Sequence, residues 1–426
     1  MENINKFNKR ERNWIMYDFA NSAYATIMIA AIFPIYFVSV CKEAGIVGDV
    51  WWGIGTSITT FTLAILAPFL GAIADFKGMK KKLFTGFLIA GLLFTIFNAF
   101  VDNWQLMLLG YVLSNIGWAG SLLFYDSFLT DVTTKEKMDR VSAWGYGMGY
   151  IGGSTIPFVM SILLIMFGEK IGVDSVQAVK LSLIITAAWW LVFSIPFLKN
   201  IKQTHYIELP PSGLLVFAFK NIWDTIKNIV ANKGILLFMV AYFFYIDGVN
   251  TVIHMATSYG ATLGLDGTGM ILALLVTQLV AFPCAILFSL LSSKFGTINM
   301  IISAIIIYFF ICIMGFYMGF GMEQGFLDNK QALNLFWVLA VMVGTCQGGI
   351  QALSRSYFGK LIPPERSNEY FGFFDIFGKF AAILGPLLYA LIAAATGRSS
   401  FAMGSIIFLF LVGGIILFIS RKHLAR

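Results

Sequence analysis

The first apolar run of the chain opens with RNWIMYDFANSAY (residues 12–24) and continues to about Val40. A helix of this length can cross the hydrocarbon core of a bilayer. The carboxylate of Asp18 and the amide of Asn21 lie inside the run, one helical turn apart. Because hydrocarbon solvates neither group, we expect Asp18 to lie at the interface, to be paired, or to face a water-filled interior. The run is longer than a signal-peptide core and lacks a cleavage pattern, which predicts a retained span.

The composition is that of a membrane protein. Of the 426 residues, 58% are hydrophobic and only 12% are charged, and the mean hydropathy is +0.81. Soluble domains carry about 25% charged residues. The chain divides into twelve apolar runs, at residues 14–40, 51–74, 83–101, 104–130, 141–167, 179–198, 234–258, 267–291, 298–320, 333–354, 371–396 and 401–420. We therefore predict an all-α membrane protein with twelve transmembrane helices.

The basic residues predict the orientation in the membrane. About 23 of the 29 Lys and Arg residues fall in the two termini and in every second loop, about 5 fall in the alternate loops, and Lys379 lies within a run. This asymmetry is typical of the positive-inside rule. It predicts two cytoplasmic termini, an even number of crossings and a multi-pass protein of the cell (plasma or inner) membrane. The net charge of +7 then reflects topology and anionic lipid headgroups, not a nucleic-acid partner.

The longest internal loop predicts two six-helix bundles, at residues 1–198 and 234–426, joined by a cytoplasmic linker at residues 199–233. After Pro210 and Pro211, apolar residues recur at helical spacing as far as Val230. This pattern is typical of an amphipathic helix on the membrane surface. A soluble linker helix is the alternative.

An internal repeat also indicates two related halves. A shift of 229 residues aligns residues 127–157 with residues 356–386, including Gly149 with Gly378 and Pro157 with Pro386. Both windows span the end of the fourth helix of a half, a loop and the start of the fifth helix. Because the match keeps the same orientation, it predicts halves related about an axis along the membrane normal.

The loop between the second and third runs carries the pattern G-x-x-x-D-x-x-G-x-K-K on Gly71, Asp75, Gly78, Lys80 and Lys81. A short loop with Gly at its turn forces an antiparallel helix pair. An ordinary basic loop is the alternative interpretation, but the whole pattern resembles the signature loop of the major facilitator superfamily. In that superfamily the loop helps to latch one conformation through charge pairs.

Charged groups near the cytoplasmic ends of other runs are further latch or gate candidates. Asp126 and Arg355 lie near the ends of the fourth and tenth helices and correspond under the repeat. Asp375 and Lys379 are spaced i, i+4 in the eleventh helix. This pair is either an intrahelical salt bridge or part of a cytoplasmic gate.

Polar residues of the seventh run share one helical face: Asp247, Asn250, Thr251, His254 and Ser258. Asp247 lies near the middle of the run, where exposure to lipid would be most costly. Both Asp247 and His254 can change protonation state, as a proton-coupled cycle requires. A buried, hydrogen-bonded helix contact is the alternative.

Amide side chains in other runs are candidates for substrate contact: Asn115, Gln278, Gln347 and, nearer the cytoplasm, Gln351. Amides can bind polar groups of a solute or join helices, and both readings stay open. The four cysteines form no CxxC pair and are expected to be packing residues. His205 and His423 lie in segments predicted to be cytoplasmic, so they cannot join His254 in a metal cluster within the membrane. We therefore predict no metal site and no cofactor.

Several strings narrow the resemblance: YDFANSAY at 17–24, RVS at 140–142, GYIGG at 149–153, EYFG at 369–372 and GK at 378–379. Together they resemble the branch of the major facilitator superfamily named for the vacuolar amino-acid effluxers of autophagy. The resemblance implies twelve helices in two pseudo-symmetric bundles (the major facilitator fold) and amino acids or similar small solutes as cargo. The string GFFDIFGK at 372–379 departs from the pattern GLYALSGK of that branch, because it adds Asp375.

We predict a secondary active transporter that moves its solute across the membrane by alternating access. Because no ATP-binding loop is present, protons or another ion gradient would supply the energy. We expect a monomer in the bilayer with a small-molecule substrate. A membrane enzyme would need clustered His, Cys or paired acids near one surface, which the sequence does not offer. A passive facilitator of the same fold and a non-transporting signalling or structural protein remain alternatives.

Overall fold

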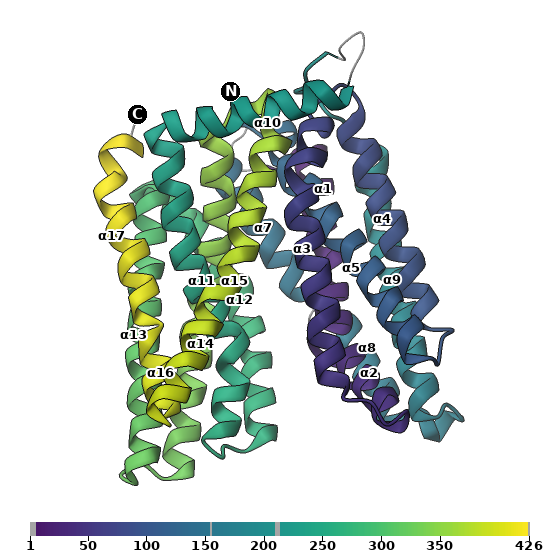
Figure 1. Ribbon diagram of the computed structural model, residues 1–426, viewed down its shortest axis with the longest axis vertical. Helices are drawn as coiled ribbons and strands as arrows, with labels where there is room; N and C mark the ends of the chain where they lie inside the picture. Colours follow the sequence, from purple (N-terminus) through teal and green to yellow (C-terminus); the bar gives the residue numbers. More distant parts are fainter. Residues whose placement is uncertain (1–5, 154–155, 209–213, 425–426) are drawn as a thin grey trace. The chain divides into compact units, whose positions relative to one another are not determined.

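The computed structural model describes residues 6–153, 156–208 and 214–424, and most of them are helical (Figure 1). The first half of the sequence forms α1 (Lys9–Tyr24), the π-helix η1 (Ala25–Ala31), α2 (Ile32–Glu43), α3 (Gly48–Ala74), α4 (Met79–Asn98), α5 (Trp104–Ser127), α6 (Leu129–Val132), α7 (Met138–Gly152), α8 (Ile156–Phe167), η2 (Gly168–Ile171) and α9 (Ser175–Asn200). The remainder forms α10 (Leu214–Ala231), α11 (Lys233–Thr262), α12 (Gly267–Phe295), α13 (Thr297–Gln324), α14 (Asn329–Leu361), η3 (Pro364–Arg366), α15 (Ser367–Thr396), α16 (Ser399–Ser405) and α17 (Ile407–Leu424).

Twelve stretches of helix are long and apolar enough to cross a membrane, within the described residues. The predicted all-α class and the predicted number of spans are confirmed. The first span is continuous through α1, η1 and α2, and the last combines α16 with α17. The third span begins at Met79, four residues before the predicted apolar run, because Lys80 is buried and belongs to the helix.

The structure forms two compact units. Unit 1 contains Met1–Val141, Met148–Thr225 and Ile362–Asp375, and unit 2 contains Ser142–Gly147, Ile226–Leu361 and Ile376–Arg426. Each unit thus combines most of one sequence half with a short segment from the fifth membrane helix of the other half. The predicted boundaries at residues 198 and 234 remain a prediction, and the exchange of these two segments was not expected from the sequence.

The stretch at residues 12–24 forms the core of unit 1, where α1 packs against α9. Trp14, Tyr17 and Tyr24 have no exposed side-chain surface. The hydroxyls of Tyr17 and Tyr24 form 2.7 Å hydrogen bonds with the hydroxyls of Ser121 and Ser114 of α5. Buried tyrosine hydroxyls need such partners, so this string has a structural role in joining α1 to α5.

In unit 2, α12 packs against α14, α11 against α17 and α13 against α14. The hydroxyl of Tyr245 on α11 is within 2.7 Å of the hydroxyl of Ser354 on α14. This polar contact lies among apolar side chains and fixes the register of the two helices.

The predicted linker helix is present as α10. The side chains of residues 209–221, which include the first part of the predicted apolar face, lie outside the described residues. Farther along, Thr225 and Ile229 are buried while Trp223 and Val230 are each 59% exposed. The position of α10 on the membrane surface remains a prediction.

Candidate functional site

The α3–α4 loop holds its carboxylate against the first turn of α15. One oxygen of Asp75 accepts hydrogen bonds from the backbone N–H of Asn368 at 2.9 Å and from its side-chain amide at 2.7 Å. The other oxygen accepts from the backbone N–H of Glu369 at 3.0 Å. The first N–H groups of a helix lack intrahelical partners and carry partial positive charge, so they favour a carboxylate. We call this contact the latch.

Glycine permits the close approach on which the latch depends. A Cβ atom at Gly71, one turn before Asp75, would lie 2.5 Å from the carbonyl oxygen of Asn368. Gly78 has a φ of 76°, a left-handed conformation that turns the chain from α3 into α4. Burial raises the pKa of Asp75 to about 7, although Lys80 and the donors on Asn368 oppose the rise. Proton binding to Asp75 is therefore linked to the state of the latch near neutral pH.

A buried ion pair lies beside the latch. The ammonium of Lys80 is 2.7 Å from Oδ2 of Asp131, and neither side chain has exposed surface. The same ammonium donates to the hydroxyl of Ser367 at 3.0 Å and to the carbonyl of Ser127 at 3.4 Å. Burial acts to raise the pKa of Asp131, but Lys80 and His205 outweigh it and hold the pKa below its usual range. Lys80 thereby joins α4 to the residues after α5 and to the start of α15.

The linker segment, residues 201–208, docks along the α3–α4 loop. The backbone N–H of Ile207 donates to the carbonyl of Asp75 at 2.8 Å, and the N–H of Lys77 donates to the carbonyl of Ile207 at 3.0 Å. The side-chain amide of Gln203 also donates to the carbonyl of Asp75, at 3.4 Å. The segment that follows α9 is thus a structural part of the latch region.

Asp131 holds the same segment from a second direction. Its Oδ1 accepts from the backbone N–H groups of Thr204 at 2.7 Å and of His205 at 2.8 Å. The ring nitrogen Nδ1 of His205 lies 3.4 Å from the same oxygen. One buried carboxylate therefore pairs with Lys80 through one oxygen and with the linker segment through the other.

We expect the linker segment to dock less firmly as the pH rises. The contact with Asp131 raises the pKa of His205, so the docked imidazole keeps its proton above about pH 6.5, the usual histidine value. A raised pKa means that His205 binds its proton more tightly when the linker segment is docked than when it is free. The stabilisation is therefore present at low pH and is lost as the pH rises through the raised pKa. Asp131 remains ionised across this range.

Thermal unfolding of the wild type and of His205→Gln, from about pH 6 to about pH 8, measures this effect. The wild type should be the more stable protein at the acidic end, and the two curves should converge at the alkaline end. Asp75 titrates in both proteins, so the difference between the curves isolates His205. A difference that does not change with pH would contradict the prediction.

A second polar contact, which we call the Arg355 clamp, holds the early part of α7 in unit 2. Arg355, which is 3% exposed, donates through Nε to the hydroxyl of Ser142 at 2.9 Å and through Nη2 to the carbonyl of Ser142 at 3.0 Å. Its guanidinium carbon lies 4.3 Å from the ring centroid of Tyr146, a cation–π distance. The shift of 229 residues places Ser142 on Phe371 (142 + 229 = 371), inside the segment of α15 that unit 1 contains. The segments of α15 and α7 that the latch and this clamp hold therefore correspond to one another under the repeat.

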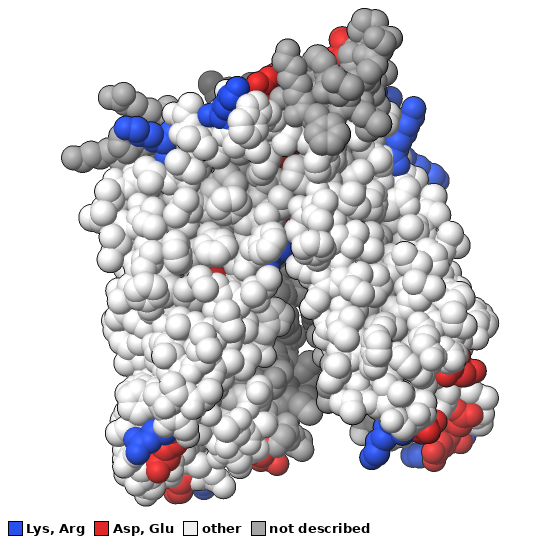
Figure 2. All heavy atoms as spheres, in the orientation of Figure 1, with Lys and Arg blue, Asp and Glu red and all other residues white. Residues whose placement is uncertain are grey.

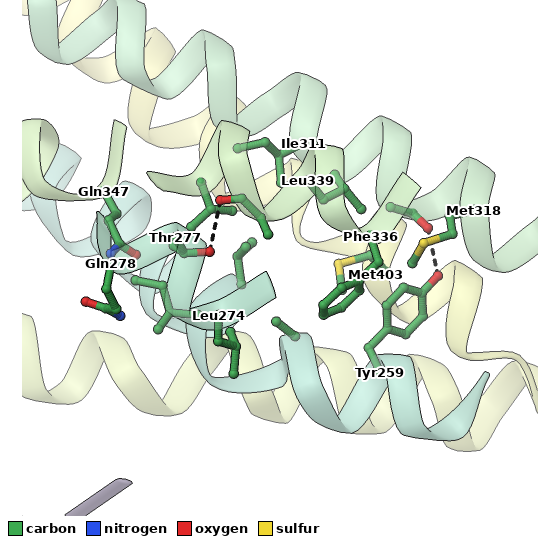
Figure 3. A pocket seen from close by; sticks show the side chains of 16 residues that line it. Tyr259, Leu274, Thr277, Gln278, Ile311, Met318, Phe336, Leu339, Gln347 and Met403 are labelled. Atoms are coloured by element: carbon green, nitrogen blue, oxygen red, sulfur yellow. Dashed lines mark hydrogen bonds between the residues drawn. The ribbon is translucent and has the colours of Figure 1, made fainter. Parts of the chain in front are cut away.

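Unit 2 contains a cavity of about 80 Å³ (Figure 3). Gln278 of α12 and Gln347 of α14 lie together at one end, and Tyr259 of α11 lies at the other. Thr277 and Tyr259 point their hydroxyls at the carbonyls of Ala340 and Gly315, at 3.0 and 2.8 Å, so both hydroxyls are occupied as donors. The wall between the two ends is apolar, formed by Leu274, Ile311, Met318, Phe336, Leu339 and Met403. The cavity can hold a small molecule with one polar end, and it is far below the ~300–1,000 Å³ of sites for drug-sized ligands.

Asp247 lies in the interface between α11 and α15. Its Oδ1 accepts from the backbone N–H of Gly385 at 2.9 Å, while its Oδ2 is buried and has no hydrogen-bond partner among the described residues. A Cβ atom at Gly385 would lie 1.9 Å from the hydroxyl oxygen of Thr251, so the two helices meet where only glycine fits. The helix contact considered from the sequence is thus present, and one carboxyl oxygen stays available to a proton.

The polar residues predicted on the first and fourth helices form helix contacts. The side-chain amide of Asn21 donates to the backbone carbonyl of Tyr17 at 2.7 Å, and the backbone carbonyl of Asn21 accepts from the indole of Trp118 at 3.1 Å. The amide of Asn115 donates to the hydroxyl of Tyr111 at 3.2 Å. Asp18 is 7% exposed and lies 3.5 Å from the Asn21 amide. These groups are buried within unit 1.

The contacts described above do not involve the remaining residues that the sequence predicts for the site. Half-buried positions are held by Asp126, Asn250, Gln351, Asp375 and Lys379, and His254 is exposed. The polar face of α11 thus passes from the buried Asp247 and Thr251 to an exposed His254. Lys81 donates to the carbonyl of Ile201 at 2.9 Å. Within the described residues, no group of three or more His, Cys, Asp or Glu could hold a metal ion.

Sequence reasoning missed Asp131, Asn368 and the docking of the linker segment. In the sequence, Glu369 stands out only as part of the string EYFG at 369–372. Both of its carboxyl oxygens are buried without a hydrogen-bond partner in the part of the chain that the structure describes. Its position beside Asp75 at the latch could not be read from the spacing, since 294 residues separate the two.

The fold resembles solved membrane transporters. A bacterial homologue of the iron transporter ferroportin superposes with a TM-score of 0.68 at 12% identity, covering 98% of this chain and 99% of that chain. The E. coli fucose:proton symporter FucP superposes with a TM-score of 0.62 at 14% identity, covering 96% and 97%. At these identities the likeness shows the fold alone, which is the fold of major facilitator transporters such as FucP.

Sequence comparison then gives the family. Residues 53–426 match the family described as "Vacuole effluxer Atg22 like", and the chain belongs to this family. The chain is 45% identical over 421 residues to the uncharacterized MFS-type transporter YxiO of Bacillus subtilis, covering 97% of this chain and 95% of the relative. It is 26% identical over 300 residues to Autophagy-related protein 22 of Botryotinia fuckeliana, covering 64% of this chain and 48% of the relative. The chain matches about half the length of that fungal protein.

Proposed function

We propose that this protein is a proton-coupled secondary transporter that moves a small amphipathic, amino-acid-like solute by alternating access. The observation that carries the proposal is the unit 2 cavity, in which the amides of Gln278 and Gln347 lie at one end of an apolar wall. Paired amides can donate to a carboxylate and accept from an ammonium group. A neutral amino acid with a short apolar side chain has the matching chemistry, and the effluxer description of the family is consistent with it.

The latch and the Arg355 clamp supply the conformational change in this proposal. Each consists of a few hydrogen bonds between a polar side chain and the early part of a membrane helix, so it can break and re-form without unfolding a core. Asp247 is the proposed proton carrier, because its Oδ2 is buried without a partner among the described residues. Loss of a proton there would leave a buried charge that favours a rearrangement.

We further propose that the latch, the linker segment and both termini are cytoplasmic, in the cell membrane. The distribution of Lys and Arg supports this orientation, because the two termini and every second loop carry most of the basic residues. Labelling of single cysteines placed in the linker segment and in the loop after α4, in intact cells, tests it.

Counterflow into proteoliposomes, with a panel of amino acids and a pH jump, tests the function. We expect exchange of at least one neutral amino acid and a response to the pH gradient. The variants Gln278→Ala and Gln347→Ala should each weaken apparent substrate affinity about tenfold or more, since each removes a buried polar contact to the solute. Gln324→Ala, at an exposed amide at the end of α13, should leave it unchanged. Flux without pH dependence would indicate a passive facilitator, and no flux of any solute would contradict the proposal.

A further inference from the structure

A second, larger pocket lies in unit 1, between the start of α4 and the linker segment. Its volume is about 660 Å³. The lining includes Lys77, Lys81, Lys82, Lys202, Thr85 and Tyr206. Two contacts hold its shape: Lys81 donates to the carbonyl of Ile201 at 2.9 Å, and Oε1 of Gln203 accepts from the backbone N–H of Gly78 at 2.9 Å. We call it the lysine pocket, and it is separate from the cavity proposed for the solute.

The lysine pocket is a concentration of positive charge with little compensation. Four of the eight lining residues are lysines and none is acidic. Lys77 forms an ion pair with Glu208 at 3.1 Å, with both side chains exposed. Lys82 and Lys202 have no salt-bridge partner among the described residues. Like charges gathered around one hollow repel one another, and an anion in the hollow relieves this repulsion.

The position of the lysine pocket favours a membrane lipid as the source of this anion. Thr85 lies within the third span and Lys77 lies outside it, so the pocket crosses the boundary where a span leaves the bilayer. Figure 2 shows basic side chains at the end of unit 1 from which α4 begins and mainly acidic ones at the opposite end of the unit. Lipid headgroup phosphates occupy this level of a membrane.

An apolar stripe continues from the lysine pocket along α4. Gly86, Ile89, Leu93 and Ile96 follow Lys82 at helical spacing and are all exposed, with Leu93 at 60%. A Cβ atom at Gly86 would meet nothing within 4 Å, so the space beside Gly86 is open. A headgroup in the pocket would place its acyl chains along this stripe.

We propose that the lysine pocket binds a phosphate group, supplied by an anionic phospholipid whose acyl chains lie on the stripe of α4. The phosphate oxygens accept hydrogen bonds from the lysine ammonium groups. Because Lys81 and Gln203 join the pocket wall to the linker segment, the bound lipid holds that segment against the α3–α4 loop. The inference does not depend on the identity of the transported solute.

Native mass spectrometry of the full-length protein in detergent tests the proposal, with phosphatidylglycerol, phosphatidylcholine or inorganic phosphate as the added probe. We expect preferential retention of phosphatidylglycerol. The double variant Lys82→Gln/Lys202→Gln should weaken it by about 25-fold, since each basic side chain contributes roughly fivefold to the binding of an anionic headgroup. The variant Lys82→Arg/Lys202→Arg should retain it. The control pair Lys135→Gln/Lys294→Gln, at two exposed lysines elsewhere, should also retain it.

The outcomes separate the possible sources of the phosphate. Competition by inorganic phosphate at the same residues would support the site and show that it accepts soluble phosphate as well. Equal retention of the two lipids by the wild type would overturn the proposal, as would unchanged binding in the glutamine double variant. The thermal midpoint without lipid, compared between the glutamine and arginine variants, shows that both are folded.

Discussion

Replacing Lys80 with methionine is expected to destabilise unit 1 by about 3–5 kcal/mol, the usual cost of removing one partner of a buried ion pair. The carboxylate of Asp131 would stay buried with its Oδ2 unpaired, and the hydroxyl of Ser367 would lose its donor at 3.0 Å. Denaturation of the purified protein in detergent measures the loss. Lys82→Met, two residues along the same helix and exposed, should change the stability by no more than about 0.5 kcal/mol.

A double variant separates charge from packing. Lys80→Met combined with Asp131→Asn removes both charges of this ion pair, and the Asn oxygen can still accept from the backbone of Thr204 and His205. We expect the double variant to recover most of the stability lost in Lys80→Met, because the unpaired carboxylate dominates the cost. Failure to recover would assign the loss to the hydrogen bonds of Lys80 with Ser367 and Ser127.

The burial of Lys80 shows what a single sequence reveals about this fold. Long apolar runs and the bias of basic residues were sufficient to predict twelve helices, because both follow from the cost of placing charge in hydrocarbon. The signature loop identified Asp75 and the glycines. Its lysines look equivalent by charge, yet Lys80 precedes the buried Phe84 and Leu88 at i+4 and i+8. Extending the buried face of α4 backward by one turn would have singled it out.

The partners in the latch could not be predicted in the same way. Asp75 meets Asn368 across 293 residues of sequence, and Lys80 meets Asp131 across 51. Such pairs are set by tertiary packing, which no local pattern encodes. Asn21 illustrates the opposite case, since its amide bonds to the carbonyl of Tyr17 one turn earlier. A polar residue in a membrane helix can satisfy itself locally, so its presence alone does not indicate a solute pathway.

The second large effect is expected at Asp247, if the proposed proton coupling is correct. Asp247→Asn should abolish accumulation driven by a pH gradient, with a loss of more than about tenfold, while counterflow without a gradient stays within about threefold. The asparagine keeps an oxygen that can accept from the N–H of Gly385 at 2.9 Å but cannot bind and release a proton. Paired measurements of uphill uptake and counterflow in proteoliposomes detect the difference.

Thr251→Val is the matched control, because Thr251 lies in the same contact and its hydroxyl donates to the carbonyl of Asp247 at 2.7 Å. It should change uphill uptake and counterflow to the same degree, as a packing defect between α11 and α15 would. If Asp247→Asn also lowers both rates equally, Asp247 serves only to join the two helices. Selective loss of uphill uptake in Asp247→Asn alone would instead require a titratable group at this position. The two variants alter the same interface, but only Thr251→Val keeps a carboxyl group whose Oδ2 can bind and release a proton.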